Sequence, residues 1–479
     1  MVDDTKGITV KKADDMAAWY GQVVIKSELA DYAPIRGFMV IRPNGYALWE
    51  AIQRTLDGLV RKRGVRNAYF PLLIPESFFR KEAEHAEGFS PEVAWIESKE
   101  GEERLAIRPT SETIMYDSYS RWIRSWRDLP LRINQWCNIV RWEVKDTKIF
   151  LRTREFLWQE GHCVYETETE CHKETLFYLE CYRRVAEGLL AVPCVVGRKT
   201  ESEKFAGAKA TYTFEGFMPD GKALQMGTSH DLGQNFSRAF DISFLGKDGQ
   251  RSLPWQNSWG ITTRLLGALV MTHGDDRGLV LPPRIASNKI AIVPIFVKDD
   301  AMNVRTIAAA RSLAKQLARF NPILDESQEY SAGWKFNQYE LQGIPLRVEI
   351  GPKDIESDQV VLVRRDTGGK SAVPRTGAAV AIRKLLDDIQ AALFQRAKER
   401  LEAAKTPVST WEEFLKADKD TRFIIAHHCG SPECEAAIKA ETQGVTARCI
   451  PLRGGKSEGA PCVKCGGKAS YRAFFARAY

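Results

Sequence analysis

The sequence lacks the features that mark membrane, secreted and low-complexity proteins. No apolar run approaches the ~20 residues that a membrane-spanning helix needs. The stretch from Met1 to Lys6 is charged and has no apolar core of the kind found in signal peptides. Internal repeats and compositionally biased tracts are also missing. These absences predict a soluble globular protein of the cytoplasm that does not associate with membranes.

A glycine-rich phosphate-binding loop is absent as well. Residues 369–371 and 455–457 both read Gly-Lys-Ser, like the end of such a loop, but its first glycine would fall at Arg364 and Ile450. Without that glycine the backbone cannot form the cradle that holds phosphate groups. Any nucleotide must therefore be bound in another way.

The chain is long and mildly basic. It has 479 residues, of which 44% are hydrophobic and 27% charged, and a formal net charge of +7. One hydrophobic core rarely supports that length, so we expect two or three domains. The positive charge suits a polyanionic partner, although a solvated surface of mixed charge would give the same value.

The ten cysteines form two groups. Five are scattered through the first half and read as small buried apolar residues: Cys137, Cys163, Cys171, Cys181 and Cys194. The other five lie close together in the last region: Cys429, Cys434, Cys449, Cys462 and Cys465. The spacings Cys429-x4-Cys434 and Cys462-x2-Cys465 favour a four-thiolate zinc site. Cys449 lies between the two pairs and remains an alternative to Cys462.

Changes in pattern divide the chain into three regions. Residues 1–283 mix aromatic-rich alternating stretches with a few helical periods. Residues 284–406 predict an α/β unit, with strands at 290–296, 346–350 and 360–363 and helices at 301–320 and 378–404. Residues 407–479 hold the cysteine cluster and show no long period.

Two motifs open the first region. Asn44 could cap a helix whose apolar positions repeat at helical spacing, and the run 65–70 predicts a strand that ends at Pro71. Further on, Thr110 and Glu112 follow Pro109 and could present a hydroxyl and a carboxylate to one ligand. The alternative is that Thr110 caps the next helix, and the residues alone favour that cap.

Residues 131–166 carry the strongest signal. Residues 131–141 predict a strand that places Arg141 and Glu143 on one face, and a polar loop at 144–153 leads into a second strand. Alternation along the second strand puts four side chains on one face: Phe156, Trp158, Glu160 and His162. A purely structural face would not collect so many ionisable groups among aromatic rings.

A late motif covers residues 258–264, which we expect to begin a helix that continues through Leu265 and Leu269. Arg264 would then lie within the buried face of that helix. An unpaired buried guanidinium is strongly destabilising, so Arg264 requires an anion there. That anion is either a protein carboxylate or a nucleotide phosphate.

Together these motifs resemble a known family. Pro71 after a helix and strand, Arg141-x-Glu143 followed by Phe156, and Arg264 in a late helix resemble the three signature motifs of class II aminoacyl-tRNA synthetases. The strings at 108–112, 152–162 and 273–283 closely resemble the prolyl-tRNA synthetase family in its archaeal and eukaryotic-type form. The resemblance covers essentially the whole chain.

The resemblance implies an α+β multidomain fold. Residues 1–283 would form a class II catalytic domain on an antiparallel sheet, which dimerises through the Pro71 element. Residues 284–406 would form an α/β anticodon-binding domain, and residues 407–479 a small α/β zinc-binding domain. The stretch 166–254 leaves no room for the large editing insertion of many bacterial relatives.

The implied reaction joins proline to ATP and then transfers the prolyl group to tRNA(Pro). Arg141 would bridge the proline carboxylate and the α-phosphate with its fork of donors. Glu143 would accept from the adenine amino group while Phe156 stacks on the ring. With Mg²⁺, the other ATP contacts would come from Arg152, Thr153, Gln225, Thr228 and Arg264.

The resemblance also implies a proline pocket. Thr110 and Glu112 would receive the secondary amine, and the ring would be enclosed by Trp158, Glu160, His162, Phe205, His230 and Ser258. Gln225 and His230 differ in parity, so both can point inward only if the strand has a turn or bulge near Gly227. Tyr479 is expected close to this site.

Three residues of the second region match positions that touch anticodon bases in the family: Glu340, Arg347 and Lys353. Arginine can read guanine bidentately, and proline anticodons carry two adjacent guanines. Without the resemblance, solvated surface charge would explain these residues equally well. Rival interpretations are a synthetase for threonine, glycine or histidine, and a non-catalytic tRNA-binding relative that would be expected to lack Arg141, Glu143 or Arg264.

Overall fold

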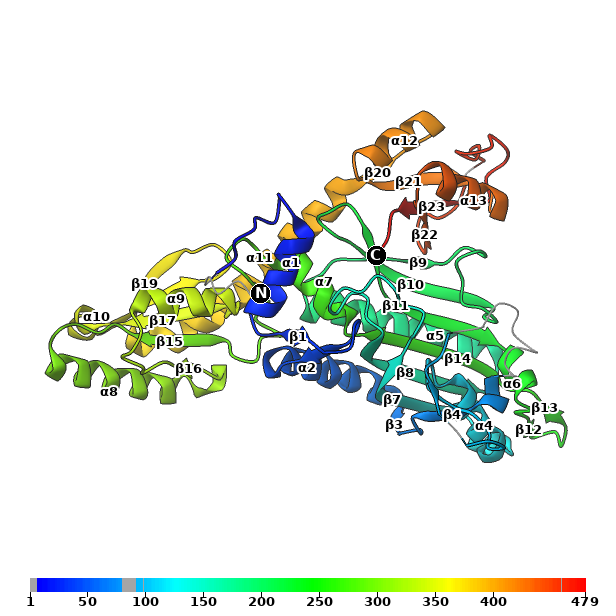
Figure 1. Ribbon diagram of the computed structural model, residues 1–479, viewed down its shortest axis with the longest axis horizontal. Coiled ribbons are helices and arrows are strands. Elements are labelled where there is room, and N and C mark those ends of the chain that lie inside the picture. The colour runs from blue at the N-terminus through cyan, green and yellow to red at the C-terminus, as the bar shows by residue number, and fades with distance from the viewer. Residues whose placement is uncertain (1–6, 80–91, 98, 458) are drawn as a thin grey trace.

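The computed structural model describes residues 7–79, 92–97, 99–457 and 459–479. Two large β-sheets organise these residues (Figure 1). One sheet has eleven strands in the order β20-β21-β23-β22-β9-β10-β11-β14-β8-β7-β3, and the other has five in the order β16-β15-β17-β18-β19. They lie on the right and left of Figure 1, and the long helix α11 (Ala378–Ala404) runs between them.

The eleven-stranded sheet is almost wholly antiparallel, as predicted for the catalytic region. Only the pairs β3–β7 and β20–β21 are parallel. Its strands from the first region are β3 (Arg66–Asn67), β7 (Leu131–Val140), β8 (Glu155–Tyr165), β9 (Val195–Arg198), β10 (Ala210–Phe217), β11 (Ala223–Gly233) and β14 (Trp255–Thr262). The predicted strand–loop–strand hairpin at 131–166 is therefore confirmed as β7 and β8.

Helices pack on one face of this sheet, and their apolar side chains form a hydrophobic core with those of the strands. They are α1 (Met16–Lys26), α2 (Pro43–Val60), α5 (Glu168–Arg184) and α7 (Arg264–His273). Odd-numbered residues of β8 face this layer, where Gln159 Oε1 accepts from the Tyr182 hydroxyl at 2.6 Å. A Cβ on Gly161 would lie 2.0 Å from the Trp259 ring, so that indole requires a glycine on the neighbouring strand. The even-numbered residues of β8 consequently face the other side.

Two expectations for helix starts are wrong. Helix α2 begins at Pro43 with Arg42 as its N-cap, so Asn44 is not the cap. Proline is pre-organised for the first helical position, which explains the earlier start. Residues 258–262 belong to strand β14, and helix α7 begins only at Arg264. Pairing of β14 with both β8 and β11 overrides the helical apolar spacing there.

Smaller elements surround the main sheet. Helices α4 (Glu112–Trp122) and α6 (Asn235–Ala239) pack around Tyr116 and Phe236 in a second core. Short strands pair as β1 (Ala30–Tyr32) with β2 (Met39–Ile41) and β12 (Phe244–Leu245) with β13 (Arg251–Ser252). Strand β6 (Leu105–Ile107) pairs with both β4 (Leu73–Pro75) and β5 (Trp95–Ile96).

The second region has the predicted α/β character. Strand β15 (Ile290–Pro294) runs parallel to β16 (Ile323–Leu324) and β17 (Leu346–Ile350), whereas β18 (Gln359–Arg364) and β19 (Lys370–Pro374) are antiparallel. Its shorter helices are α8 (Asp300–Gln316), α9 (Ala332–Leu341) and α10 (Pro352–Glu356). Apolar residues of α8, α11 and the sheet form a separate core.

The third region continues the catalytic sheet, which the sequence did not indicate. It contributes β21 (Phe423–His428), β22 (Thr446–Pro451) and β23 (Tyr471–Ala476), with helices α12 (Trp411–Lys419) and α13 (Pro432–Glu441), and β20 (Lys405–Pro407) spans its predicted boundary with the second region. Strand β22 pairs with β9, where Ile450 lies opposite Arg198. The last region, orange to red in Figure 1, is thereby joined to the catalytic region edge to edge.

Residues 166–254 are fully accounted for by this architecture. They form α5, β9, β10, β11, α6 and the β12–β13 hairpin, and leave no separate folded unit. The expected absence of an editing insertion agrees with this arrangement. In the described ranges, no helix is both long and apolar enough to cross a bilayer.

Candidate active site

A cavity of about 550 Å³ opens on the face of the large sheet opposite α5. Every residue predicted to bind proline or ATP lines it. They are Thr110, Glu112, Arg141, Glu143, Arg152, Thr153, Phe156, Trp158, Glu160, His162, Phe205, Gln225, Thr228, His230, Ser258 and Arg264. The cavity thus brings all the predicted proline and ATP residues together, whereas their individual roles remain predictions.

Cross-strand register brings these residues together. His162 on β8 lies opposite Ser258 on β14, which lies opposite His230 on β11. In the next row Gly260 lies between Glu160 and Thr228 and adds no side chain. Residues directly opposite on one face of a sheet are close neighbours. The two rows therefore form a continuous polar floor from three different strands.

One end of the cavity is acidic. The Thr110 hydroxyl donates to the Glu112 carboxylate, and Glu160 Oε1 accepts from Gln135 Nε2 at 2.9 Å. The alternative role of Thr110 as a helix cap is wrong, because α4 begins at Glu112 with Ser111 as its N-cap residue. Two buried carboxylates at one end favour a ligand that carries a positive charge.

His162 completes the acidic end. Its Nε2 lies 3.1 Å from Glu160 Oε2, and its Nδ1 lies 3.0 Å from the Tyr116 hydroxyl. Burial disfavours the charged ring, but the hydrogen bond to Glu160 and the nearby carboxylates outweigh it and raise the pKa of His162. Glu112, Glu160 and His162 are close enough to hold a metal ion. Glu112 accepts from Thr110 and Glu160 contacts His162, so all three already have partners within the described chain.

His230, unlike His162, has a lowered pKa. Burial, with the charge of His162, lowers the pKa of His230 to about 3. Its Nδ1 lies 2.9 Å from Thr211 Oγ1 and its Nε2 lies 2.9 Å from Thr228 Oγ1. This neutral ring packs against Phe205, with centroids 4.7 Å apart. The pair provides an uncharged wall beside the acidic end.

The other end of the cavity is cationic. The Arg141 guanidinium lies 5.9 Å from the ring centroids of both Phe156 and Trp158, and within the described chain it donates a hydrogen bond to Pro109 O at 3.5 Å. Arg264 donates to Leu151 O and Gln225 O, each at 3.0 Å. Among the described residues, neither arginine forms an ion pair with a carboxylate.

The surroundings of Arg264 disfavour its charged form. Burial, followed by the positive charge of Arg141, lowers the pKa of Arg264 to about 10. Burial also lowers the pKa of Arg141. The anion that Arg264 was expected to need is therefore not a protein carboxylate of the described chain. The two positive charges repel each other, so each arginine makes it less favourable for the other to be charged. An external anion that contacts both would remove this destabilisation.

The loop between β7 and β8 brings Arg152 to the same end. Lys148 and Arg152 pair through both backbone hydrogen bonds, at 2.7 and 2.9 Å, so the loop is a folded hairpin tip. Arg152 and Glu143 are exposed at the cavity mouth, whereas Thr153 is buried and donates to Glu155 O at 2.7 Å. Phe156 begins the wall of the cavity directly after this tip.

The parity conflict along β11 is resolved by the predicted bulge. Glu215 on β10 lies opposite Gln225, and Phe214 lies opposite Gly227, which leaves Met226 as the extra residue. One extra residue reverses the facing of the strand from that point. Gln225, Thr228 and His230 consequently all line the cavity.

Three family models match the chain. Residues 94–273 match the tRNA synthetase class II core domain (G, H, P, S and T), and residues 289–385 match an anticodon binding domain. Residues 411–479 match the C-terminal domain of prolyl-tRNA synthetase.

Relatives match over the whole length. The proline–tRNA ligase 2 of Clostridioides difficile (strain 630) is 50% identical over 98% of this chain and 97% of its own. The chain belongs to the prolyl-tRNA synthetase family. The proline–tRNA ligase of Cenarchaeum symbiosum (strain A) is 49% identical over 99% of each chain. That of Chloroherpeton thalassium (strain ATCC 35110 / GB-78) is 50% identical over 98% of each.

Some cavity residues escaped the sequence analysis of this synthetase. Lys199, Glu203, Lys204 and Thr211 line the cavity, and Tyr479 reaches it as expected. The alternation of Thr211, Thr213 and Glu215 along β10 was a usable signal for this face. Lys199 to Lys204 lie in irregular backbone, where no periodicity indicates which side chains point inward.

The three residues predicted to touch the anticodon lie in the five-stranded unit, but in different settings. Arg347 donates from Nη1 to Glu340 at 3.1 Å and from Nε to Glu349 at 2.9 Å, and lies 3.8 Å from the Phe336 ring centroid. Lys353 is exposed at the start of α10. Glu340 also lies 3.6 Å from Arg277 of the catalytic region. The structure thus links Arg347 and Glu340 directly and leaves Lys353 apart.

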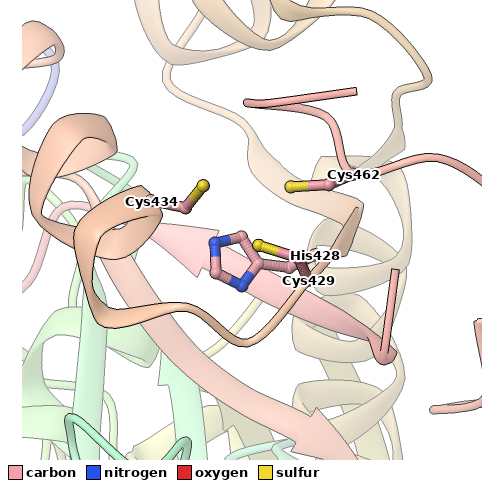
Figure 2. A group of neighbouring side chains, drawn as sticks. All are labelled: His428, Cys429, Cys434 and Cys462. Carbon is pink, nitrogen blue, oxygen red and sulfur yellow. The ribbon is translucent and has the colours of Figure 1, made fainter. Parts of the chain in front are cut away.

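The cysteine cluster forms a compact group (Figure 2). Donor atoms of His428, Cys429, Cys434 and Cys462 lie within 4.8 Å of one another, and the labelled side chains in Figure 2 point toward a common space. Cys465 Sγ lies 3.9 Å from Cys429 Sγ. Cys449 is buried against Gly197 on β9, outside the group, so Cys462 is the cysteine that joins it.

This donor set suits zinc. Thiolates and imidazole are the ligands that zinc prefers, and the buried Nε2 of His428 has no hydrogen-bond partner among the described residues. The four predicted ligands Cys429, Cys434, Cys462 and Cys465 remain a prediction. His428, which the sequence analysis missed because it sought paired cysteines, is an alternative to Cys465.

Proposed function

We propose that this protein activates L-proline with ATP to form prolyl-adenylate and pyrophosphate, and then transfers proline to the 3′ end of tRNA(Pro). The observation that supports this proposal is the separation of negative and positive side chains at the two ends of the cavity. Carboxylates lie at one end, and Arg141 and Arg264, which form no ion pair among the described residues, lie at the other. A free amino acid presents an ammonium and a carboxylate in that order, and ATP adds further negative charge.

The acidic end would orient proline. Glu112 and the Thr110 hydroxyl would bind the secondary amine, and Glu160, which is hydrogen-bonded to His162, would form the neighbouring wall. Trp158 is fixed by donating from Nε1 to Cys137 Sγ at 3.1 Å, which holds its ring beside the pocket. Ser258 Oγ is buried without a hydrogen-bond partner in the described structure, so it is free to contact the ligand.

The cationic end would bind the nucleotide. Arg141 would hold the proline carboxylate against the α-phosphate, so that the carboxylate oxygen attacks phosphorus as pyrophosphate leaves. Arg152 and Arg264 would bind the outer phosphates, Phe156 would stack on adenine, and Glu143 would accept from its amino group. Mg²⁺, when bound with ATP, neutralises charge on the phosphate oxygens. No side chain needs to transfer a proton in this step.

Proline-dependent exchange of pyrophosphate into ATP tests the proposal. We expect exchange with proline and none above background with threonine, glycine or histidine. Alanine should support weaker exchange, because it fits inside the pocket and each missing carbon costs only ~1–3 kcal/mol of discrimination. Exchange with another amino acid but not with proline would overturn the assignment, and no exchange with any would favour a non-catalytic relative.

The zinc site gives a second prediction. We expect native mass spectrometry to find about one zinc per chain, released by Cys429→Ser because a lost thiolate opens the tetrahedral site. Cys465→Ser and His428→Asn, measured separately, identify the fourth ligand. Cys449→Ser is the matched control and should retain the metal. Wild-type protein that carries no zinc after expression in zinc-containing medium would contradict the site.

We further propose that the synthetase is a cytoplasmic homodimer. Apolar side chains stand exposed along the stretch that ends near Pro71, including Tyr32 at 68% and Tyr69 at 71% exposure. Large exposed apolar side chains are candidates for contact with a second copy of the chain. A cytoplasmic location fits an enzyme whose product is used in translation.

A further inference from the structure

Arg448 of the C-terminal region forms an ion pair with Glu215, which in turn binds a residue that lines the active-site cavity. It lies on β22 and donates from Nη2 and Nε to Glu215 Oε2, at 3.1 and 3.3 Å. The other oxygen of Glu215 accepts from Lys199 Nζ at 2.9 Å, and Lys199 lines the cavity. The Glu215 side chain is fully buried, so its position depends on both cations.

A second contact from the same region lies next to the first. Thr200 donates from Oγ1 to Glu435 Oε2 at 3.0 Å. Glu435 lies in the first turn of α13 and is itself held by the Tyr471 hydroxyl, which donates to its Oε1 at 3.2 Å. The C-terminal region therefore holds Thr200 directly and the neighbouring Lys199 indirectly, through Glu215.

The other end of this segment carries Phe205. The Phe205 amide donates to Thr211 Oγ1 at 2.9 Å, and its ring packs on His230. Between the two ends, residues 201–204 form turns with no strand pairing of their own. The placement of Phe205 thus depends on the anchors at Lys199 and Thr200 as well as on Thr211.

We propose that Arg448 and Glu435 are positioning residues for the amino-acid pocket. They hold segment 199–205 so that Phe205 closes the pocket around the proline ring, although neither residue lines the cavity. This inference rests on the proposed function, in which Phe205 is a wall of the proline pocket. Small displacements of a binding group by distant residues have large effects on substrate binding.

The test removes both anchors from the C-terminal side. In Arg448→Met/Glu435→Ala we expect the KM for proline in pyrophosphate exchange to rise about tenfold while the KM for ATP changes less than about twofold. If Arg448 and Glu435 only stabilised the fold, their loss would change the KM for proline and the KM for ATP together. Arg453→Met/Glu412→Ala removes an exposed arginine and an exposed glutamate from the same region and should leave both constants unchanged.

The outcomes separate the two proposals. Wild-type exchange with proline tests the proposed function by itself. If the wild type is active and the double variant shows an unchanged proline KM, or a parallel rise of both constants, the positioning role is wrong. If the double variant does not fold, Thr200→Val removes one anchor from the catalytic side without loss of bulk, and a rise of about threefold in the proline KM alone is expected. Arg448→Lys should recover part of the affinity, because it keeps the charge beside Glu215.

Discussion

Replacing Arg141 by alanine is expected to slow proline activation by about 10³-fold or more, measured as kcat/KM in pyrophosphate exchange. Arg141 lies at the cationic end of the cavity, within electrostatic reach of Glu112 and Glu160, and forms no ion pair with a described carboxylate. Its guanidinium is therefore available to both reacting anions at once. Loss of that bridge removes the group that holds the attacking oxygen against phosphorus, and nothing else in the described cavity occupies the same place.

Two further variants sharpen this test. Arg141→Lys keeps the charge but loses the planar fork, so its rate should fall between those of wild type and alanine. Arg132→Ala removes another partly buried arginine, on β7, which pairs with Glu170 and does not line the cavity. We expect near-normal exchange from it. Near-normal exchange in Arg141→Ala would remove Arg141 from the mechanism.

The hairpin β7–β8 shows why so much of the site could be predicted. Alternation in a strand is a local property, so the side chains of Phe156, Trp158, Glu160 and His162 had to share a face once the strand was identified. The same rule forced a bulge between Gln225 and His230, and the structure places it at Met226. Local rules thus determined which residues face the cavity.

Long-range pairing set the limits of prediction. The apolar spacing at 258–264 suited a helix, yet β14 pairs along its length with β8 and β11. In the same way, nothing in the last region indicated that β22 would join β9, or that Arg448 would reach Glu215. His428 was not predicted because the spacing of the cysteines alone already supplied four ligands, although only Cys462 of the group lies far from it along the chain. The domain boundaries at 283/284 and 406/407 remain predictions.

Replacing Arg347 by alanine is expected to reduce kcat/KM for charging tRNA(Pro) about 10- to 100-fold, because a bidentate contact to guanine is worth about 1–3 kcal/mol. Proline activation without tRNA should change less than about twofold, since Arg347 belongs to a different sheet from the cavity. In the free protein Arg347 pairs with Glu340 and Glu349, so binding a guanine would require it to share or exchange these partners.

The fold of the second region should survive this change. Glu340 keeps Arg277 at 3.6 Å and Glu349 keeps Lys370 at 3.7 Å, so neither carboxylate is left without a cation nearby. Arg311→Ala is the matched control, because Arg311 is exposed in the same region and pairs only with Glu326 among the described residues. Charging transcripts with one anticodon guanine replaced gives the decisive comparison. Wild type should discriminate against them, and Arg347→Ala should discriminate less. Equal loss of activation and charging would show that Arg347 acts through folding and does not read the anticodon.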